Sequence, residues 1–440
     1  MTPAGNRLDP STWPAALRQA MSSLPDSSRM VVALSGGLDS VFLLNAAASW
    51  FADRDDCTVS ALHVNHQLQP AARDMAEYSR LACDALGVQL VQVRVDVSDG
   101  DSIENEARKA RYRAFEQHLQ PDDCLLMAHH ADDQAETVLF RLVRGSGVRG
   151  LAGMPQSREL GAGHLCRPLL GLERRDIEAL AGSWGLQWFD DPTNAETGFD
   201  RNYLRHQVLA PLVHRWPGVL GSIGRAARQC DEASQLTARL AALQRREIED
   251  GQGRLSVSGL VALDDLPAQK NLLRWWLIDC GYEPPPAARL EQALTDLLYA
   301  GQDREPELRG EGYHLRRYRE RLYCLRDKFD EPVSPATWVT SERLSWAGGE
   351  VRAIGGGRCL TLTVTARAGG ERLRPVPGGP SRPLKKWLQE QGVPPWERDR
   401  IPLIWQDGEL MAVGDLWVSP TLVEATGVAS WRIVWERDCR

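Results

Sequence analysis

Apolar runs and helical stretches alternate from Met30 to Thr137, and this alternation limits the fold more than any other feature of the chain. Four runs of strand length lie at residues 31–34, 58–64, 88–95 and 124–128. Strands that alternate with helices form a parallel sheet covered on both faces, and ligands bind at the carboxyl ends of its strands. We therefore expect an α/β fold with a doubly wound parallel sheet, whose helices begin near Ser40, Ala71, Ser102 and Ala131.

A glycine loop follows the first of these strands: Ser35-Gly36-Gly37-Leu38-Asp39-Ser40. Glycine adopts backbone conformations closed to other residues, so several N–H groups here can point into one anion-binding concavity. The apolar residues that resume at Val41 predict the start of a helix, whose positive dipole end faces the same concavity. The hydroxyls of Ser35 and Ser40 add donors, while Asp39 would repel a phosphate unless it holds a bridging Mg²⁺.

Other glycine loops differ from this one in residue type. No Lys precedes Ser40, as a Walker A loop requires, and the loop contains neither Gly-x-Gly-x-x-Gly nor Gly-x-Ser-x-Gly. It resembles the PP-loop of the ATP pyrophosphatases, which cut ATP between its α- and β-phosphates and activate an oxygen as the adenylate. An ordinary strand-to-helix turn is the alternative.

The fourth strand leads into a motif rich in histidine and carboxylate: His129-His130-Ala131-Asp132-Asp133-Gln134-Ala135-Glu136-Thr137. Helical spacing predicts one buried stripe and one polar face. The buried stripe consists of Ala135, Val138, Leu139 and Leu142, and the polar face of Asp133, Glu136, Thr137 and Arg144. An exposed helix that complements its own dipole is one alternative. A divalent metal site of two histidines and two carboxylates, without ATP chemistry, is another.

Two further helices carry basic residues. Arg108 and Arg111 lie three residues apart between the third and fourth strands, and arginine suits a triphosphate, although intrahelical pairing with Glu104 also explains them. Arg201, Asn202 and Arg205 open a later helix with a mixture of groups suited to RNA. An ordinary polar helix face is the alternative there.

The length of 440 residues exceeds what one core usually serves, so we expect about three domains. The expected domains are a catalytic domain at 1–250, a small mixed domain at 255–330 and a β-rich α+β domain at 336–440. Nine scattered cysteines argue against a disulfide framework and a Cys-x-x-Cys site. No apolar stretch approaches the ~20 residues of a membrane span, and no signal peptide is evident, which predicts a cytoplasmic protein without a membrane partner.

The net charge of −7 leans against nucleic-acid binding, but phosphate backbones are attracted by local patches. Three windows are basic, at residues 137–149, 314–326 and 367–386. The last window combines basic residues with Trp387, a mixture that grips RNA by charge and stacking. Its candidates for RNA contact are Arg372, Arg374, Lys385 and Lys386. A tryptophan in a small β domain is more often part of the core.

Taken together, the motifs resemble the tRNA(Ile)-lysidine synthetase family from about Val31 to the C-terminus. The segments that carry the resemblance are residues 35–40, 63–66, 106–112, 129–137, 167–170, 191–205 and 367–387. One departure is Gln69-Pro70, where the family usually places an arginine. The resemblance implies ATP-dependent ligation of L-lysine to C2 of the wobble cytidine of tRNA(Ile) with anticodon CAU. The cytidine is first adenylated, pyrophosphate and AMP are released, codon reading changes from AUG to AUA, and identity changes from Met to Ile.

The resemblance also implies roles for particular residues. Residues 35–40 hold pyrophosphate, and Asp39 carries Mg²⁺. Arg111, or Arg108, acts with His129 on the charge that grows at the α-phosphate. Asp133 and Glu136 receive the ammonium groups of lysine, and the base that deprotonates lysine is either a carboxylate or His129. The partners are the tRNA and free L-lysine, and a homodimer stays open.

Other readings of the same chain change the nucleophile or remove the chemistry. Sulfur transfer usually needs a close cysteine pair, and glutamine-fed amidation needs a nucleophilic Cys domain; the chain has neither. An NAD-synthetase-like enzyme leaves the C-terminal basic windows unexplained. In an ATP-sensing RNA-binding protein, Asp133 and Glu136 would be dispensable.

Overall fold

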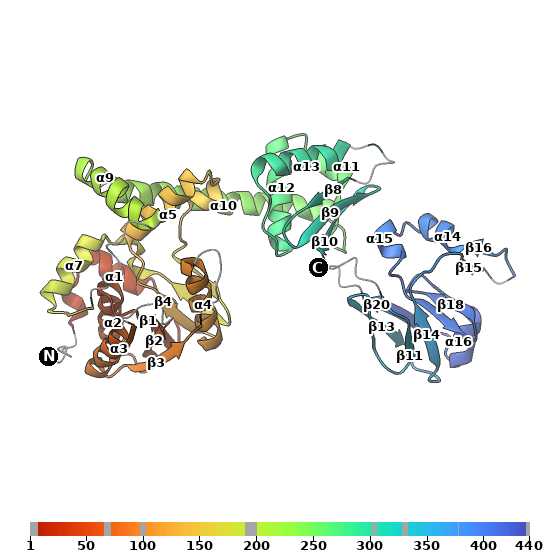
Figure 1. Cartoon of the computed structure of the whole chain (residues 1–440), viewed down its shortest axis with the longest axis horizontal. Coiled ribbons are helices and arrows are strands. Elements are labelled where there is room, and N and C mark those ends of the chain that lie inside the picture. Colours follow the sequence, from red (N-terminus) through yellow and green to blue (C-terminus); the bar gives the residue numbers. More distant parts are fainter. Residues whose placement is uncertain are drawn as a thin grey trace. The chain divides into compact units, whose positions relative to one another are not determined.

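The computed structural model describes residues 8–65, 72–96, 103–189, 200–299, 301, 306–327, 333–376 and 378–436. The chain divides into two compact units, Met1–Leu236 and Thr237–Arg440, each of which is described separately (Figure 1). The boundaries expected at residues 250 and 336 stay predictions.

A six-stranded sheet forms the centre of the first unit, in the order β3-β2-β1-β4-β6-β5. The strands are β1 (Arg29–Ala33), β2 (Thr58–Asn65), β3 (Gln89–Arg94), β4 (Asp123–Leu126), β5 (Ser157–Leu160) and β6 (Gly163–Cys166). All neighbours pair in parallel except β5, which runs antiparallel to β6. The order reverses between β1 and β4, and this switch point is where ligands bind in such sheets. The predicted doubly wound fold is confirmed.

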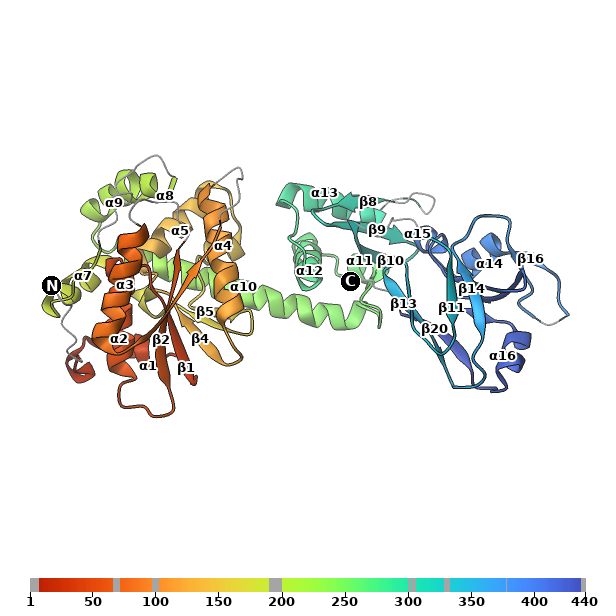
Figure 2. The same cartoon turned by 60° about the horizontal axis from the view of Figure 1, so that its bottom comes forward.

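Helices cover both faces of this sheet. On one face lie α1 (Ala15–Ser22), α2 (Leu38–Trp50), α3 (Ala72–Leu86) and α7 (Arg174–Ser183), and on the other lies α4 (Ile103–His118) (Figure 2). Successive residues of β1 alternate between the two cores: Met30 and Val32 pack with Phe42 of α2, and Val31 packs with Phe115 of α4. A buried side chain of this size contributes roughly 1.5–3 kcal/mol, so both layers fix the position of β1.

Helix α2 begins at Leu38, two residues before the start expected near Ser40 and three before Val41, where the apolar residues resume. Its first intrahelical hydrogen bond runs from the N–H of Val41 to the carbonyl of Gly37, at 3.0 Å. The first turn carries the polar residues of the glycine loop, which hide its helical character in the sequence. The helix therefore starts directly after the second glycine.

Helix α5 (Ala131–Val143) confirms the start expected at Ala131, but not the expected distribution of its faces. Leu142 is 53% exposed, whereas Glu136 and Thr137 of the presumed polar face are only 2% and 5% exposed. That face is buried because a later segment covers it. This segment comprises α8 (Asp200–Tyr203) and the π-helical turn η4 (Leu204–Leu209).

The remaining elements of the first unit are short. They are η1 (Pro10–Thr12), α6 (Val148–Leu151), η2 (Pro168–Gly171) and α9 (Ala210–Arg215). The long helix α10 (Val219–Ile248) continues into the second unit.

The second unit begins with an antiparallel sheet, in the order β7-β10-β9-β8. Its strands are β7 (Leu255–Ser256), β8 (Glu307–Arg309), β9 (Tyr313–Tyr318) and β10 (Arg321–Arg326). Three helices accompany the sheet: α11 (Val257–Ala262), α12 (Leu266–Asp279) and α13 (Ala287–Tyr299). Trp276, 1% exposed, lies in the core that joins helices and sheet.

The C-terminal part of the second unit is rich in short strands. A five-stranded sheet, in the order β11-β14-β17-β18-β19, is accompanied by a three-stranded sheet, β12-β13-β20, and by the hairpin β15-β16. The strands are β11 (Ala336–Val339), β12 (Leu344–Trp346), β13 (Gly349–Ile354), β14 (Thr361–Thr365), β15 (Arg372–Leu373), β16 (Arg382–Pro383), β17 (Leu403–Gln406), β18 (Glu409–Val413), β19 (Trp417–Val418) and β20 (Arg432–Glu436). The helices are α14 (Leu384–Glu390), α15 (Pro395–Arg398) and α16 (Pro420–Thr426). Trp387 is 6% exposed and packs in this core, which confirms the core interpretation.

Candidate active site

A cavity of about 440 Å³ opens where β1, β2 and β4 end. Its size is that of a typical small-molecule site. The glycine loop follows β1, His63 lies on β2, and the histidine–carboxylate motif follows β4, so the topology brings all three to one wall. The polar and charged residues of the wall include Ser35, Asp39, Ser40, His63, Arg111, His129, His130, Asp133, Arg174 and Arg205.

The glycine loop is built around the hydroxyl of Ser40. The N–H groups of Ser35 and Gly36 donate to Ser40 Oγ at 3.1 and 3.2 Å, and this Oγ donates to the carbonyl of Gly37 at 3.0 Å. Gly36 has a φ of +91°, a conformation that favours glycine, whereas Gly37 has a φ of −77°. Ser40 therefore shapes the loop, and a direct bond from its hydroxyl to a phosphate stays a prediction.

The N-terminus of α2 supplies the anion site. The N–H groups of Leu38, Asp39 and Ser40 precede the first hydrogen bond of the helix and have no partner within it. All three residues line the cavity. Together with the positive end of the helix dipole, these N–H groups attract a phosphate or another anion.

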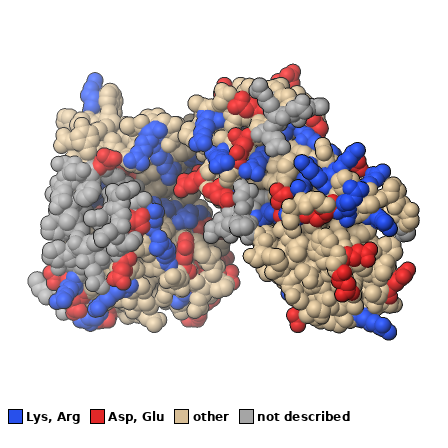
Figure 3. Space-filling view, turned by 45° about the vertical axis from the view of Figure 1, so that its right-hand side comes forward, with Lys and Arg blue, Asp and Glu red and all other residues tan. Residues whose placement is uncertain are grey.

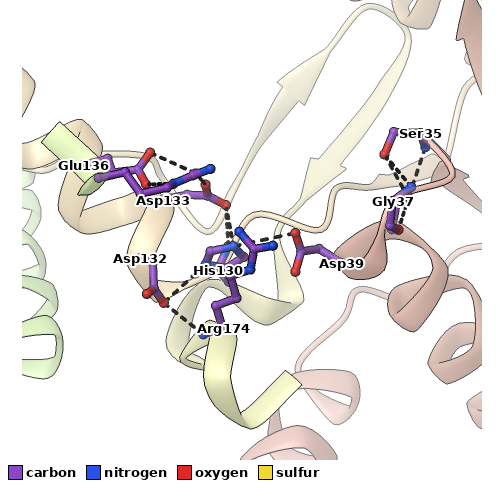
Figure 4. A network of polar contacts seen from close by, with 10 residues as sticks. Ser35, Gly37, Asp39, His130, Asp132, Asp133, Glu136 and Arg174 are labelled. Atoms are coloured by element: carbon purple, nitrogen blue, oxygen red, sulfur yellow. Dashed lines mark hydrogen bonds and ion pairs between the residues drawn. The ribbon is translucent and has the colours of Figure 1, made fainter. Parts of the chain in front are cut away.

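His130 lies at the centre of a polar network next to this helix end (Figure 4). It is 1% exposed, and its Nε2 lies 3.7 Å from Asp39 Oδ2 and 3.4 Å from Asp133 Oδ2. Burial disfavours its charged form, but the hydrogen bond with Asp132 and the charges of Asp133 and Asp39 outweigh burial and raise the pKa of His130. A protonated His130 offsets part of the negative charge that these carboxylates bring together.

Asp39 presents a buried carboxylate oxygen, Oδ1, that has no hydrogen-bond partner in the described part of the chain. Burial raises the pKa of Asp39, against the influence of His130. Mg²⁺ is commonly held by one or two carboxylates together with substrate phosphates, so this orphaned oxygen beside an anion site fits Mg²⁺. Among the described residues, no group of three or more His, Cys, Asp and Glu is arranged to hold a metal ion, which gives no support to the alternative of a metal site without ATP.

Two carboxylates on the first turns of α5, the buried Glu136 and the partly exposed Asp133, hold a cation. Arg205 Nε donates to Glu136 Oε1 at 2.5 Å, and its Nη2 lies 3.2 Å from Glu136 Oε2 and 3.3 Å from Asp133 Oδ1. The sequence placed Arg205 on an RNA-facing helix side. In the structure its guanidinium lies in the cavity wall and pairs with Glu136 and Asp133, and a contact with RNA stays a prediction.

Four further residues of the predicted motifs differ in their placement. Arg111 of α4 lines the cavity, whereas the guanidinium carbon of Arg108 lies 5.1 Å from the ring centre of Tyr112. His63 is 4% exposed, and its Nδ1 donates to the carbonyl of Leu34 at 2.9 Å, which holds the end of β1. His129 lines the cavity, and its Nδ1 accepts a hydrogen bond from Arg167 Nε at 3.3 Å.

The residues expected to contact RNA are divided between the two units. The Arg201 side chain, His66, the departure at Gln69-Pro70 and the 191–199 part of the motif lie outside the described residues, and Asn202 is half-buried on α8. In the second unit, Arg372 Nη2 donates to the carbonyl of Ser381 at 2.8 Å, while Arg374, Lys385 and Lys386 are exposed. Figure 3 shows Lys and Arg side chains gathered on the surface of this unit.

Sequence reasoning missed Arg174, which lies in the cavity wall (Figure 4). Its backbone N–H donates to Asp132 Oδ2 at 2.9 Å, so α5 and the first turn of α7 are tied together. One signal was present in the sequence: Arg174 and Arg175 occupy the first turn of a helix, where the dipole disfavours cations. Such a placement indicates that another interaction holds the charge there.

Comparison with known proteins first identifies the class of protein to which the N-terminal part of the chain belongs. Residues 12–212 match the family model described as the PP-loop domain. Residues 255–323 match the TilS substrate binding domain, and residues 362–435 match the TilS substrate C-terminal domain. The first unit therefore contains the ATP-binding domain of the PP-loop ATP pyrophosphatases.

Full-length relatives then define the family. The chain is 40% identical to tRNA(Ile)-lysidine synthase of Alkalilimnicola ehrlichii, with 97% of this chain and 98% of the relative covered. It is 39% identical to the protein of the same name from Pseudomonas aeruginosa, with 95% and 96% covered. The chain belongs to the tRNA(Ile)-lysidine synthase family, whose members are ligases of tRNA modification. Among solved structures, the U34-tRNA thiolase NcsA of Methanococcus maripaludis matches 49% of this chain and 76% of its own, at 18% identity and a TM-score of 0.41.

None of the described helices combines the length and apolar character of a membrane-spanning segment.

Proposed function

We propose that this chain ligates L-lysine to C2 of the wobble cytidine of tRNA(Ile) with anticodon CAU. The observation that carries the proposal is a single cavity with two opposite preferences. Its lining includes a helix N-terminus that attracts an anion, and it also includes Asp133, whose carboxylate together with that of the buried Glu136 holds the guanidinium of Arg205. Adenylation by ATP followed by attack of a cationic amino acid requires this combination.

In the first step, the C2 oxygen of the cytidine attacks the α-phosphate of ATP and pyrophosphate leaves. The N–H groups at the start of α2 bind the departing pyrophosphate, and Arg111 and His129 offset the negative charge that grows at the α-phosphate. The cytidine must leave its stack to reach this cavity, which an anticodon loop permits at low cost.

In the second step, the ε-amine of lysine attacks C2, and AMP leaves with the former C2 oxygen. Asp133 and Glu136 bind the ammonium groups of lysine. These ammonium groups take the place of the Arg205 guanidinium at the same carboxylate oxygens. The lysine nitrogen must lose a proton before it attacks, so a base within reach of the cavity is required.

Mg²⁺ is part of this proposal, with Asp39 as its ligand from the protein. The buried and unpartnered Oδ1 of Asp39 supports that assignment. When bound, the ion would neutralise charge on the phosphates of ATP. The residues of the protein that orient the phosphates are those of the glycine loop.

The tRNA is proposed to lie along both units, with contacts from Arg201, Asn202, Arg205, Arg372, Arg374, Lys385 and Lys386. Of these, Arg374, Lys385 and Lys386 carry the strongest support, because they are exposed and the described structure contains no ion pair that occupies any of them. A cytoplasmic location and a homodimer complete the proposal. The modified tRNA would read AUA instead of AUG and carry Ile instead of Met.

The proposal is tested by AMP release from Mg-ATP with a tRNA(Ile) transcript that bears CAU, with and without L-lysine. We expect AMP release that depends on both substrates and is lost when the wobble cytidine is replaced by uridine. AMP release without tRNA would contradict the proposal and favour adenylation of a small molecule. ATP binding without any AMP release would favour an ATP-sensing RNA-binding protein.

A further inference from the structure

Arg167 is a buried cation beside the cavity. It follows β6, is 3% exposed, and forms no ion pair with a carboxylate in the part of the chain that the structure describes. Its side chain instead donates to two neutral acceptors, the carbonyl of Pro155 at 2.7 Å and Nδ1 of His129 at 3.3 Å. A buried charge is costly unless it is both hydrogen-bonded and paired with an opposite charge, and Arg167 is hydrogen-bonded without a paired carboxylate, so this arrangement indicates a specific task.

The sheet fixes the contact between Arg167 and His129. Strands β4 and β6 are parallel neighbours with Leu126 opposite Cys166, so residues that follow the two strands meet at the same edge. The backbone N–H of Arg167 donates to the carbonyl of Gln156 at 2.8 Å, which holds the arginine in place. Arg167 is therefore positioned by the scaffold and not by a ligand.

This contact defines the proton position on His129. A guanidinium has only donors, so Nδ1 of His129 must be the acceptor and carry no proton. A charged imidazolium has no acceptor nitrogen, and a neutral ring with an unprotonated Nδ1 carries its proton on Nε2. His129 lines the cavity, and Nε2 has no hydrogen-bond partner among the described residues, so this N–H is available to a bound molecule.

We propose that Arg167 is a positioning residue that holds His129 as the neutral Nε2–H tautomer. His129 then donates a hydrogen bond to the oxygen that gains charge, and it does not act as the base for lysine. This inference rests on the proposed function and sharpens it, because the proton of the lysine ammonium must then pass to a carboxylate of the cavity.

The charges around His129 agree with this assignment. Burial and the neighbouring Arg167, together with Arg108 and Arg111 of α4, lower the pKa of His129 to about 3, against the opposing influence of Asp133 on α5. A histidine in this environment stays neutral at the pH of a cell. A neutral imidazole that donates from one nitrogen is a suitable hydrogen-bond donor in a cavity that binds phosphate.

The test uses the full-length protein labelled with ¹⁵N at histidine. The ring resonances of His129 are identified by their loss in His129→Gln. We expect Nδ1 in the unprotonated range and Nε2 in the protonated range at pH 7. Arg167→Leu should populate the other tautomer, whereas Arg158→Gln should leave the resonances unchanged, because Arg158 is a nearby arginine that contacts the Tyr112 ring but not His129.

Activity gives a second readout. We expect Arg167→Leu to lower lysine-dependent AMP release about 10–100-fold, because His129 loses its hydrogen bond with a charged group. His129→Gln should retain more activity than His129→Asn, because only the glutamine amide reaches the position of Nε2. This comparison does not depend on whether Arg167→Leu folds.

Three results would overturn the inference. They are a proton on Nδ1 in the wild-type protein, unchanged His129 resonances in a folded Arg167→Leu variant, and higher activity of His129→Asn than of His129→Gln. The resonances are recorded without substrate. Failure to form lysidine would therefore contradict the proposed function while the tautomer is still measured.

Discussion

Replacing Gly36 by alanine should loosen the phosphate-binding loop, whereas the same replacement at Gly37 should not. Gly36 has a φ of +91°, and a Cβ at this position would lie 3.3 Å from Ser79 Oγ and 3.4 Å from the carbonyl oxygen of Met75. A left-handed conformation costs a residue with a Cβ about 1–2 kcal/mol. The backbone oxygen on α3 cannot easily move away, so the loop has no cheap relaxation.

Gly37→Ala is the matched control. Gly37 has a φ of −77°, and its added Cβ would meet only Ser35 Oγ, at an ordinary distance of 3.7 Å. Alanine is a poorer residue at a helix N-cap, but it reduces the entropy of the unfolded chain, and the two effects roughly cancel. The two variants have the same composition and differ in the backbone conformation that they must adopt.

Hydrogen exchange of peptides that cover residues 29–50 measures the difference. A cost of about 1–2 kcal/mol corresponds to an increase of roughly 5–30-fold in local opening for Gly36→Ala, with little change for Gly37→Ala. Affinity for ATP, measured by calorimetry, should fall in the same order. Equal exchange in the two variants would refute the argument that the left-handed turn at Gly36 holds the loop.

Three further predictions concern other sites. Glu136→Gln removes the charge of a carboxylate that is 2% exposed. We expect the KM for lysine to rise about 10-fold or more while ATP affinity is retained, since a hydrogen bond to a charged group contributes about 1.5–3 kcal/mol. An unchanged KM for lysine would show that Glu136 is not part of the lysine site. Lys385→Gln combined with Lys386→Gln should reduce the slope of log tRNA affinity against log salt concentration by about two charges. Arg343→Gln is the control, because Arg343 lies 3.3 Å from Glu350 and is already paired. Equal slopes for the double variant and the control would show that neither lysine contacts phosphate. Burial alone would raise the pKa of Glu307, but hydrogen bonds with His314 and Arg316 outweigh it and lower this pKa to about 2. The ionised carboxylate of Glu307 therefore stabilises the fold above pH 4.5, and this stabilisation is lost as the pH falls towards 2. Urea unfolding of wild type and Glu307→Gln should therefore converge over that interval, and a constant difference would contradict the assignment.

The strands and the phosphate-binding loop could be predicted because their signals are local. An apolar run of strand length, two adjacent glycines and a resumed apolar pattern each lie within a few residues, and Met30 to Leu44 contains all three. The alternation of such runs then fixed the class of sheet, and the class of sheet fixed where the motifs meet. The position of His129 and Asp133 at the cavity follows from this topology.

The environment of α5 could not be predicted, because a distant segment creates it. Arg205 is 69 residues from Glu136 along the chain, and its guanidinium turns a face that reads as solvent-exposed into a buried ion pair. The contact between Arg167 and His129 spans 38 residues and depends on the neighbouring positions of β4 and β6. Helical periodicity reports which face is polar, but not which polar face another element will cover.

The most direct test of the account follows one oxygen atom. A tRNA(Ile) with CAU is prepared with ¹⁸O at the C2 oxygen of the wobble cytidine and incubated with the protein, Mg-ATP and L-lysine. If this oxygen attacks the α-phosphate and leaves when lysine attacks C2, the released AMP carries the ¹⁸O and the RNA carries the lysine. AMP without ¹⁸O, formed while lysine is attached, would contradict adenylation of the cytidine.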